Sequence, residues 1–115
     1  MAKNRKKRLD AAQLDAVAGL FGVLAEPSRL TLLQALQAGP LSVGGLVERT
    51  GLKQANVSKQ LGVLQAAGVV GRKRDGNLAI YSIRMPLVFE LCDTVCRGVA
   101  QQAAEQAAAL RRPRG

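Results

Sequence analysis

The sequence predicts a mostly α-helical fold with one small β-hairpin. Two observations predict the helices: apolar residues recur every three to four positions over most of the chain, and residues typical of helix ends separate the periodic segments. A third predicts the hairpin, because Asp75-Gly76 joins two strand-like runs, 69–74 and 78–83. A chain of 115 residues fits one domain with a single core.

The first two helices are predicted from apolar spacing. Residues 10–25 form the first helix, with its apolar face on Leu14, Val17, Phe21 and Leu24. Pro27 suits the first turn of a second helix, because the missing N–H of proline is not needed there. The pair Gly39-Pro40 ends that helix.

A short helix, a tight turn and a longer helix follow. Ser42 is a suitable N-cap for a third helix at 43–49, and the turn lies at 50–52. The fourth helix runs to Ala67, where Gly68 ends it. After the hairpin, whose Asp75-Gly76 turn we expect to be type I′, a long last helix is expected from Met85-Pro86 to Leu110.

Positive charge is distributed unevenly. Of 17 Lys and Arg residues, five lie in residues 1–8 and three in residues 111–115, which leaves nine against eight acidic residues in between. We therefore expect a disordered basic arm at 1–8, one folded domain at 9–110 and a basic tail at 111–115. Between Thr50 and Arg74 there are five basic residues and no acidic one, which favours a polyanionic partner.

Composition excludes several classes of protein. The chain has no histidine, which removes the commonest general base and metal ligand, and no arrangement of catalytic residues indicates an enzyme. No apolar run is long enough for a membrane span, and no secretory signal is expected. Two cysteines are too few for a disulfide scaffold, so we expect a cytoplasmic protein.

The fourth helix has an outer face suited to DNA. With Val57, Leu61 and Leu64 facing inward, the outer face is small, polar and free of acidic residues. It carries Gln54, Ala55, Asn56, Ser58, Lys59 and Gly62. Asn and Gln pair with adenine edges, and Lys reaches guanine or phosphate. A plain solvated helix face would show the same residues, so the face alone does not decide the function.

The hairpin adds weight to the DNA interpretation. Arg72, Lys73 and Arg74 come soon after the fourth helix, where they can contact phosphates or the minor groove beside the same site. A helix-turn-helix followed by a basic hairpin is a winged helix. The sequence thus predicts a winged helix-turn-helix that binds double-stranded DNA.

Three segments resemble the ArsR/SmtB family of winged-helix transcriptional repressors: "LAEPSRLTLLQAL" at 24–36, the stretch 51–83, and the long last helix. The resemblance implies a homodimer formed through the first and last helices. It also implies operator DNA, expected as an inverted repeat, that is released when an inducer binds. DNA contacts fall on Gln54, Asn56, Ser58, Lys59 and Gln60, and wing contacts on Arg72, Lys73 and Arg74.

Two positions depart from the family pattern. Lys53 stands where relatives commonly have a Ser N-cap, so the start of the fourth helix is expected to lack a side-chain cap. Gln60 stands where relatives often have His. Arg29 matches a family arginine that we interpret as structural rather than as a DNA contact.

Cys92 and Cys96 are the candidate sensor residues. They lie four positions apart on one face of the last helix, and no transition-metal site is expected around them. No cofactor is expected beyond a thiol modification or arsenite at this pair. One reading is packing, because free Cys behaves as a small hydrophobe. The other is a thiol switch that responds to oxidants, reactive sulfur or arsenite.

Two further alternatives concern what the winged helix binds. A non-specific or architectural DNA-binding protein would have the same basic ends, but it would not need the polar set on the fourth helix. A winged helix that binds only protein would have no use for the basic hairpin. Neither alternative is excluded by the residues alone.

Overall fold

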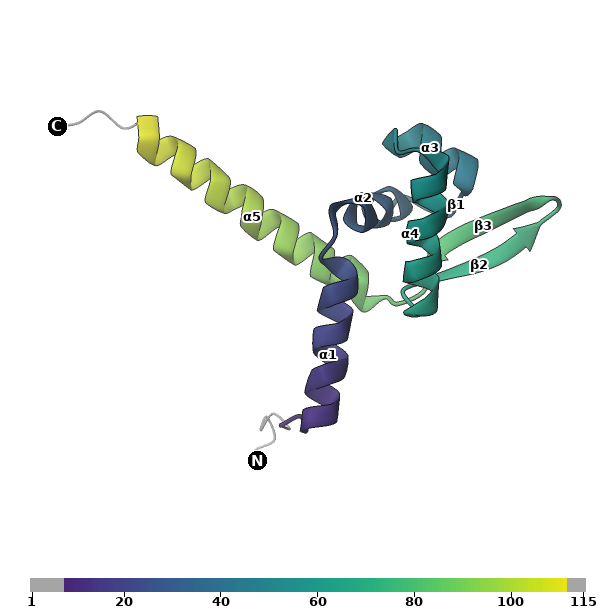
Figure 1. Ribbon diagram of the computed structural model, residues 1–115. Helices are drawn as coiled ribbons and strands as arrows, with labels where there is room; N and C mark the ends of the chain where they lie inside the picture. The colour runs from purple at the N-terminus through teal and green to yellow at the C-terminus, as the bar shows by residue number, and fades with distance from the viewer. Residues whose placement is uncertain (1–7, 112–115) are drawn as a thin grey trace.

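The computed structural model describes residues 8–111 and shows five helices and a three-stranded sheet in that range. Most of the predicted basic arm and of the basic tail, residues 1–7 and 112–115, lies outside the described residues. Helices α2, α3 and α4 and the sheet form a compact head, residues 27–83 (Figure 1). Helices α1 and α5, which we call the outer helices, leave this head in different directions.

The first three helices begin close to the predicted positions. Helix α1 (Ala11–Leu24) begins after Asp10, which exchanges two hydrogen bonds with Gln13 in a capping box. Helix α2 (Pro27–Leu36) has Pro27 at its first position. Helix α3 (Val43–Thr50) is capped by Ser42, whose Oγ accepts a 3.0 Å bond from the Gly45 amide.

Helix α4 (Gln54–Ala66) follows a turn that needs glycine. Gly51 has φ +76°, a left-handed conformation that glycine adopts without steric cost. Lys53, at the N-cap of α4, makes no side-chain capping bond, as predicted. Gly68, with φ +78°, lies just beyond the C-terminal end of α4, also as predicted.

The sheet has the order β1-β3-β2 and is antiparallel. Strands β2 (Val70–Asp75) and β3 (Leu78–Ile83) form the predicted hairpin, and β1 (Leu41–Ser42), which the sequence analysis missed, pairs with Tyr81 and Ile80 of β3. The predicted type I′ turn at Asp75-Gly76 is wrong. Asp75 pairs with Leu78, so Gly76-Asn77 is the turn, and Gly76 alone has positive φ (+64°). Glycine at the first turn position is typical of type II′.

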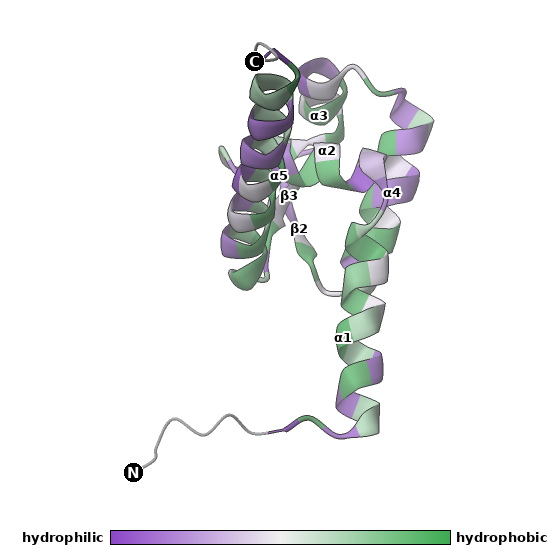
Figure 2. Ribbon diagram, turned by 90° about the vertical axis from the view of Figure 1, so that its left-hand side faces the viewer, coloured by the Kyte–Doolittle hydropathy of each residue, from purple (hydrophilic) through white to green (hydrophobic). Residues whose placement is uncertain are grey.

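The core lies between α2, α3, α4 and the base of the sheet. Its fully buried members include Leu32, Leu33, Leu46, Leu61 and Leu64. Helix α5 (Leu87–Arg111) contributes only one buried residue, Val88. Figure 2 shows hydrophobic residues along α1 and α5, outside this core. Within residues 8–111 no single helix is long and apolar enough to cross a membrane; only the bent pair α1 and α2 has the combined length and composition.

Candidate nucleic-acid interface

Helix α4 presents a polar face to solvent because its apolar residues pack into the head. Val57, Leu61 and Leu64 are fully buried in the head. The opposite face exposes Gln54, Ala55, Ser58, Lys59 and Gly62. Three of the five residues predicted to read bases, Gln54, Ser58 and Lys59, are therefore free to meet DNA.

Gln60 does not lie on this face, so the prediction that it contacts DNA needs correction. Its side chain is only 7% exposed. Its Oε1 accepts a 2.8 Å bond from Arg29 Nη1, and its Nε2 donates a 3.0 Å bond to Asn56 Oδ1. Both ends of the amide are thus used inside the protein. The helical wheel held the signal, because Gln60 lies only about 65° from the buried direction at 100° per residue.

Asn56 is half-buried at the edge of the outer face. It accepts from Gln60, and its Nδ2 donates a 3.2 Å bond to Ser28 Oγ. The two bonds use one N–H of Nδ2 and one lone pair of Oδ1, and they orient the amide of Asn56. Arg29, interpreted from the sequence as structural, bonds Gln60 and the carbonyl of Val23.

The hairpin of β2 and β3, which we call the wing, carries basic residues on both of its faces. Arg72, Lys73 and Arg74 are all exposed. Because side chains alternate along a strand, Arg72 and Arg74 share one face, opposite Tyr81 and Ala79 of β3, whereas Lys73 lies on the other. The three charges therefore do not form a single row, and only two of them can meet the same surface directly.

Arg84 is a basic residue that the sequence analysis missed. Its side chain lies across Gly71, where an added Cβ would come within 3.0 Å of Arg84 Cδ. Arg84 lines a hollow of about 320 Å³ at the base of the wing, together with Gly71, Arg72, Lys73 and Ser82. Its position directly after β3 was the available signal.

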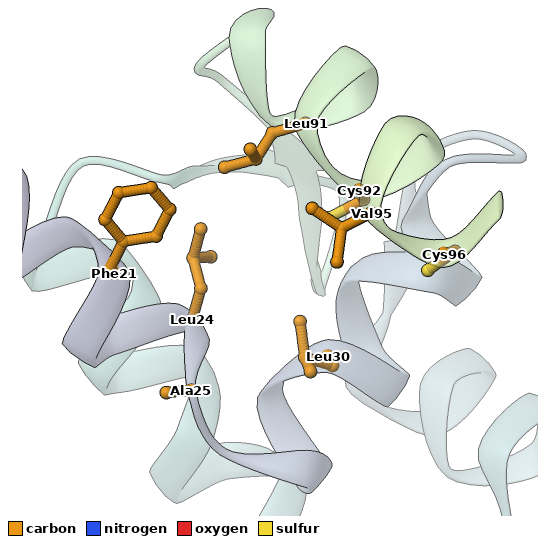
Figure 3. A pocket seen from close by; sticks show the side chains of 8 residues that line it. All are labelled: Phe21, Leu24, Ala25, Leu30, Leu91, Cys92, Val95 and Cys96. Atoms are coloured by element: carbon orange, nitrogen blue, oxygen red, sulfur yellow. The ribbon is translucent and has the colours of Figure 1, made fainter. Parts of the chain in front are cut away.

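The two cysteines lie where α5 passes the start of α2. Cys92 is half-buried and Cys96 is exposed, and both are free thiols. They line an apolar pocket of about 250 Å³ between α1, α2 and α5 (Figure 3). Its other lining residues are Phe21 and Leu24 of α1, Ala25 just after α1, Leu30 of α2, and Leu91 and Val95 of α5. A second pocket, of about 210 Å³, lies between the same cysteines and Gln34 of α2, with Gln37 just beyond the end of that helix.

The surroundings of Cys92 disfavour its ionised form. Burial raises the pKa of the Cys92 thiol, and the nearby Cys96 and Asp93 raise it further. A raised pKa lowers the thiolate fraction at neutral pH, and the thiolate is the reactive form. Among residues 8–111 no group of three His, Cys, Asp or Glu side chains is placed to hold a metal ion.

The outer helices keep much of their apolar surface exposed. Phe21 is 53% exposed on α1, and Val95 and Val99 are 52% and 60% exposed on α5. Contiguous exposed apolar residues of this kind mark an interface. They correspond to the two helices through which the resemblance implies a dimer.

A helix-turn-helix whose second helix exposes a polar face, followed by a basic hairpin, defines a winged helix-turn-helix DNA-binding module. A family model described as a helix-turn-helix domain matches residues 24–71. The HTH-type transcriptional regulator Rv0081 of Mycobacterium tuberculosis is 42% identical over 94 residues, which cover 81% of this chain and 82% of the relative. The chain belongs to the ArsR family of winged helix-turn-helix transcriptional regulators.

Solved structures agree with this assignment. The crystal structure of Rv0081 has a TM-score of 0.75 at 37% identity, over 85% of this chain and 99% of that one. The AntR antimony-specific transcriptional repressor has a TM-score of 0.76 at 32% identity, over 90% and 93%. The homodimeric winged helix-turn-helix domain of Mb0332 from Mycobacterium bovis has a TM-score of 0.67 at 26% identity, over 96% and 100%.

These relationships establish the general activity. Winged helix-turn-helix regulators of this family bind DNA, act as homodimers and are not enzymes. The predicted fold class, a mostly helical winged helix-turn-helix with a small β-hairpin, is confirmed, and the relative Mb0332 is a homodimer. Dimerisation through the first and last helices stays a prediction.

Proposed function

We propose that the protein is a sequence-specific repressor whose homodimer binds an inverted-repeat operator and releases it in response to an inducer. The observation that carries the proposal is the acid-free outer face of α4 next to the basic wing (Figure 1). Gln54, Ser58 and Lys59 face the major groove, while the wing meets the flanking backbone. In a dimer, two α4 helices must lie about one DNA turn, roughly 34–36 Å, apart.

The test removes one charge from each half of the interface. The double variant Lys59→Ala, Arg74→Ala should bind operator DNA at least about tenfold more weakly, and the slope of log Kd against log salt should fall by about one for each lost phosphate contact. Arg111→Ala, an exposed charge in the last turn of α5, is the matched control. Equal behaviour of the double variant and this control would contradict the proposal.

Specificity needs its own measurement. The unmodified protein should prefer its operator over a scrambled duplex by about 10³-fold or more at fixed salt. A ratio near one would favour the alternative of an architectural DNA-binding protein, which uses backbone contacts alone.

We propose Cys92 and Cys96 as the site where the inducer acts. Support comes from their placement, because both thiols line the pockets between α5 and α2 and lie beside the apolar surface of the outer helices. Peroxide would take two electrons and two protons from a thiol pair, giving a disulfide and two waters. Arsenite would exchange hydroxyl groups for thiolates and release water; since it prefers three thiolates, it would need a thiol from the partner subunit.

The effect on DNA would be geometric. A modified α5 changes the angle between subunits and hence the distance between the two α4 helices. A shift of about 1–3 kcal/mol toward the weak-binding arrangement lowers affinity about 5–150-fold.

The inducer test compares reduced protein with protein treated with peroxide, polysulfide or arsenite, in a titration of the DNA upstream of its own gene. We expect one treatment to weaken binding, and Cys92→Ser and Cys96→Ser to remove the response. Cys92→Val keeps an apolar side chain of similar size and separates packing from chemistry. If no treatment changes binding by the unmodified protein, the cysteines act in packing, as the half-burial and raised pKa of Cys92 would explain.

A further inference from the structure

A chain of hydrogen bonds joins α2 to α4 inside the head. Gln60 is the buried polar residue at its centre, among the residues described. Arg29 donates to Gln60, Gln60 donates to Asn56, and Asn56 donates to Ser28, over distances of 2.8, 3.0 and 3.2 Å. Among residues 8–111, every buried side-chain nitrogen or oxygen has a hydrogen-bond partner. The series of hydrogen bonds around Gln60 therefore leaves no buried polar atom unpaired.

Arg29 extends the chain to α1. Its Nε donates to the carbonyl oxygen of Val23, which lies in the last turn of α1. The last four carbonyls of a helix have no partner within the helix, so this bond satisfies one of them. The planar guanidinium donates in two directions at once, to α1 through Nε and to α4 through Nη1.

We propose that Arg29 and Gln60 are positioning residues for DNA recognition, which set the rotation of α4 about its own axis. The inference rests on the proposed function, because it takes α4 as the helix that reads DNA. The three apolar residues of α4 hold it against the core, but apolar contacts are not directional and tolerate small rotations. Hydrogen bonds are directional. Since Lys59 and Gln60 are neighbours on one rigid helix, a rotation that moves Gln60 also moves Lys59 across the groove.

The key variant is Gln60→Met, which keeps the length of the side chain and removes both hydrogen bonds. The readout is the ratio of two dissociation constants at fixed salt. One is for the duplex that the unmodified protein selects from a random library, and the other is for a scrambled duplex of the same length. We expect the ratio to fall about tenfold, comparable to losing one base-pair contact, with less than a twofold change on scrambled DNA.

This ratio separates positioning from stability. A variant that is merely less stable has a smaller active fraction, which lowers binding to both duplexes equally and leaves the ratio unchanged. Gln65→Met is the matched control, because Gln65 lies on the same helix and is exposed. Its ratio should remain within twofold of the unmodified protein.

A conservative variant should rescue recognition. Gln60→Glu keeps an acceptor for Arg29, and the Asn56 amide can turn so that Nδ2 donates to the new carboxylate while Oδ1 accepts from Ser28. We expect its ratio to stay within twofold, although the added charge weakens binding to both duplexes. Arg29→Lys should lower the specificity ratio about as much as Gln60→Met does. The single ammonium group of lysine cannot donate in the two directions that the guanidinium group serves.

The outcomes are decisive either way. An unchanged ratio in folded Gln60→Met or Arg29→Lys overturns the inference, and so does failure of both variants to fold, since that indicates a role in folding alone. Lys59→Ala in the same assay tests the proposed function separately. If Lys59→Ala weakens operator binding while Gln60→Met keeps its ratio, only the present inference fails; if Lys59→Ala has no effect, the proposed function itself fails.

Discussion

The head and the outer helices bury their apolar residues in different ways. In the head, leucines such as Leu33, Leu46 and Leu61 have no exposed surface. On the outer helices, Phe21 and Val99 are more than half exposed, and their apolar stripes have no complete partner within one chain. The difference teaches that a single chain completes the core of the DNA-binding half but leaves apolar surface exposed on the outer helices. Exposed apolar surface of this kind marks an interface, and the relative Mb0332 is a homodimer.

Two residues of the head depart from this division. Leu78, 58% exposed, lies next to the turn at the tip of the wing, away from the core. Leu30, 44% exposed, faces α5 across the pocket that holds the cysteines (Figure 3). Leu30 thus lines both pockets between α2, which carries Arg29, and the cysteines of α5.

The largest effect on stability is expected from truncating a buried side chain in the head. Leu61→Ala should lower the free energy of unfolding by about 2–5 kcal/mol, because it removes a fully buried side chain and leaves a cavity. Thermal unfolding at several protein concentrations measures it. Leu110→Ala is the control; Leu110 is 87% exposed, so its change should stay within about 0.5 kcal/mol. A loss below 1 kcal/mol for Leu61→Ala would contradict a tightly packed core in the head.

The next effect concerns the outer helices. Val99→Glu should weaken the dimer about 100-fold, because an unpaired carboxylate is costly to bury in an apolar interface. Sedimentation equilibrium measures it, and secondary structure by circular dichroism should be retained. Ala108→Glu adds the same charge on the opposite side of α5, nine residues further on, and should leave the dimer intact. Equal dimerisation of the two variants would mean that the α5 stripe is not an interface.

Features with local signals were predicted well from the sequence. Ser42 and the helix-starting Pro27 placed the starts of α3 and α2, because each acts on the backbone of its own first turn. Apolar spacing placed the start of α1 within one residue, at Asp10 instead of Ala11. The predicted hairpin was right in its strands but wrong in its turn. Asp-Gly and Gly-Asn both satisfy short hairpins, and the strand register decides between them.

Features that depend on distant residues were not predicted. Strand β1 has only two residues, and its existence depends on pairing with β3, about forty positions later. Gln60 was assigned to the DNA surface from the family resemblance, and its partner, Arg29, lies 31 residues earlier in the sequence. A polar residue at an intermediate wheel position points inward when a donor from another helix lies within hydrogen-bond distance, and the wheel of one helix does not show that donor.

A smaller effect is expected at the boundary between the head and the outer helices. Iodoacetamide should modify Cys96 several-fold faster than Cys92 at pH 7, because Cys92 is half-buried and its pKa is raised. Peptide mass spectrometry after timed labelling separates the two sites. Modification of Cys92 should speed up steeply as the pH rises towards its raised pKa. Faster labelling of Cys92 than of Cys96 at pH 7 would contradict this.

The raised pKa of the Cys92 thiol also predicts how the free energy of unfolding depends on pH. The Cys92 thiol ionises at a lower pH in the unfolded chain than in the fold, so the folded chain holds the proton more tightly. Its contribution to stability is complete below the pKa of the unfolded chain and is lost as the pH rises through the folded pKa. Denaturant titrations of unmodified protein and Cys92→Ser should therefore converge in alkaline solution. If the difference in free energy of unfolding between the two proteins instead widened as the pH rose, the prediction would be wrong.

The smallest effect sharpens the comparison within the head, at the start of α4. Lys53→Ser should raise the free energy of unfolding by about 1 kcal/mol, because a serine Oγ can accept an amide bond that Lys53 leaves unmade. It also removes a positive charge from the positive end of the helix dipole. Lys59→Ser removes the same charge six residues later, inside the helix, where a serine has no amide to cap. Thermal unfolding compares the two variants. Equal melting temperatures would mean that the start of α4 is already held by its packing, and that the missing cap leaves no weak point in the helix that reads DNA.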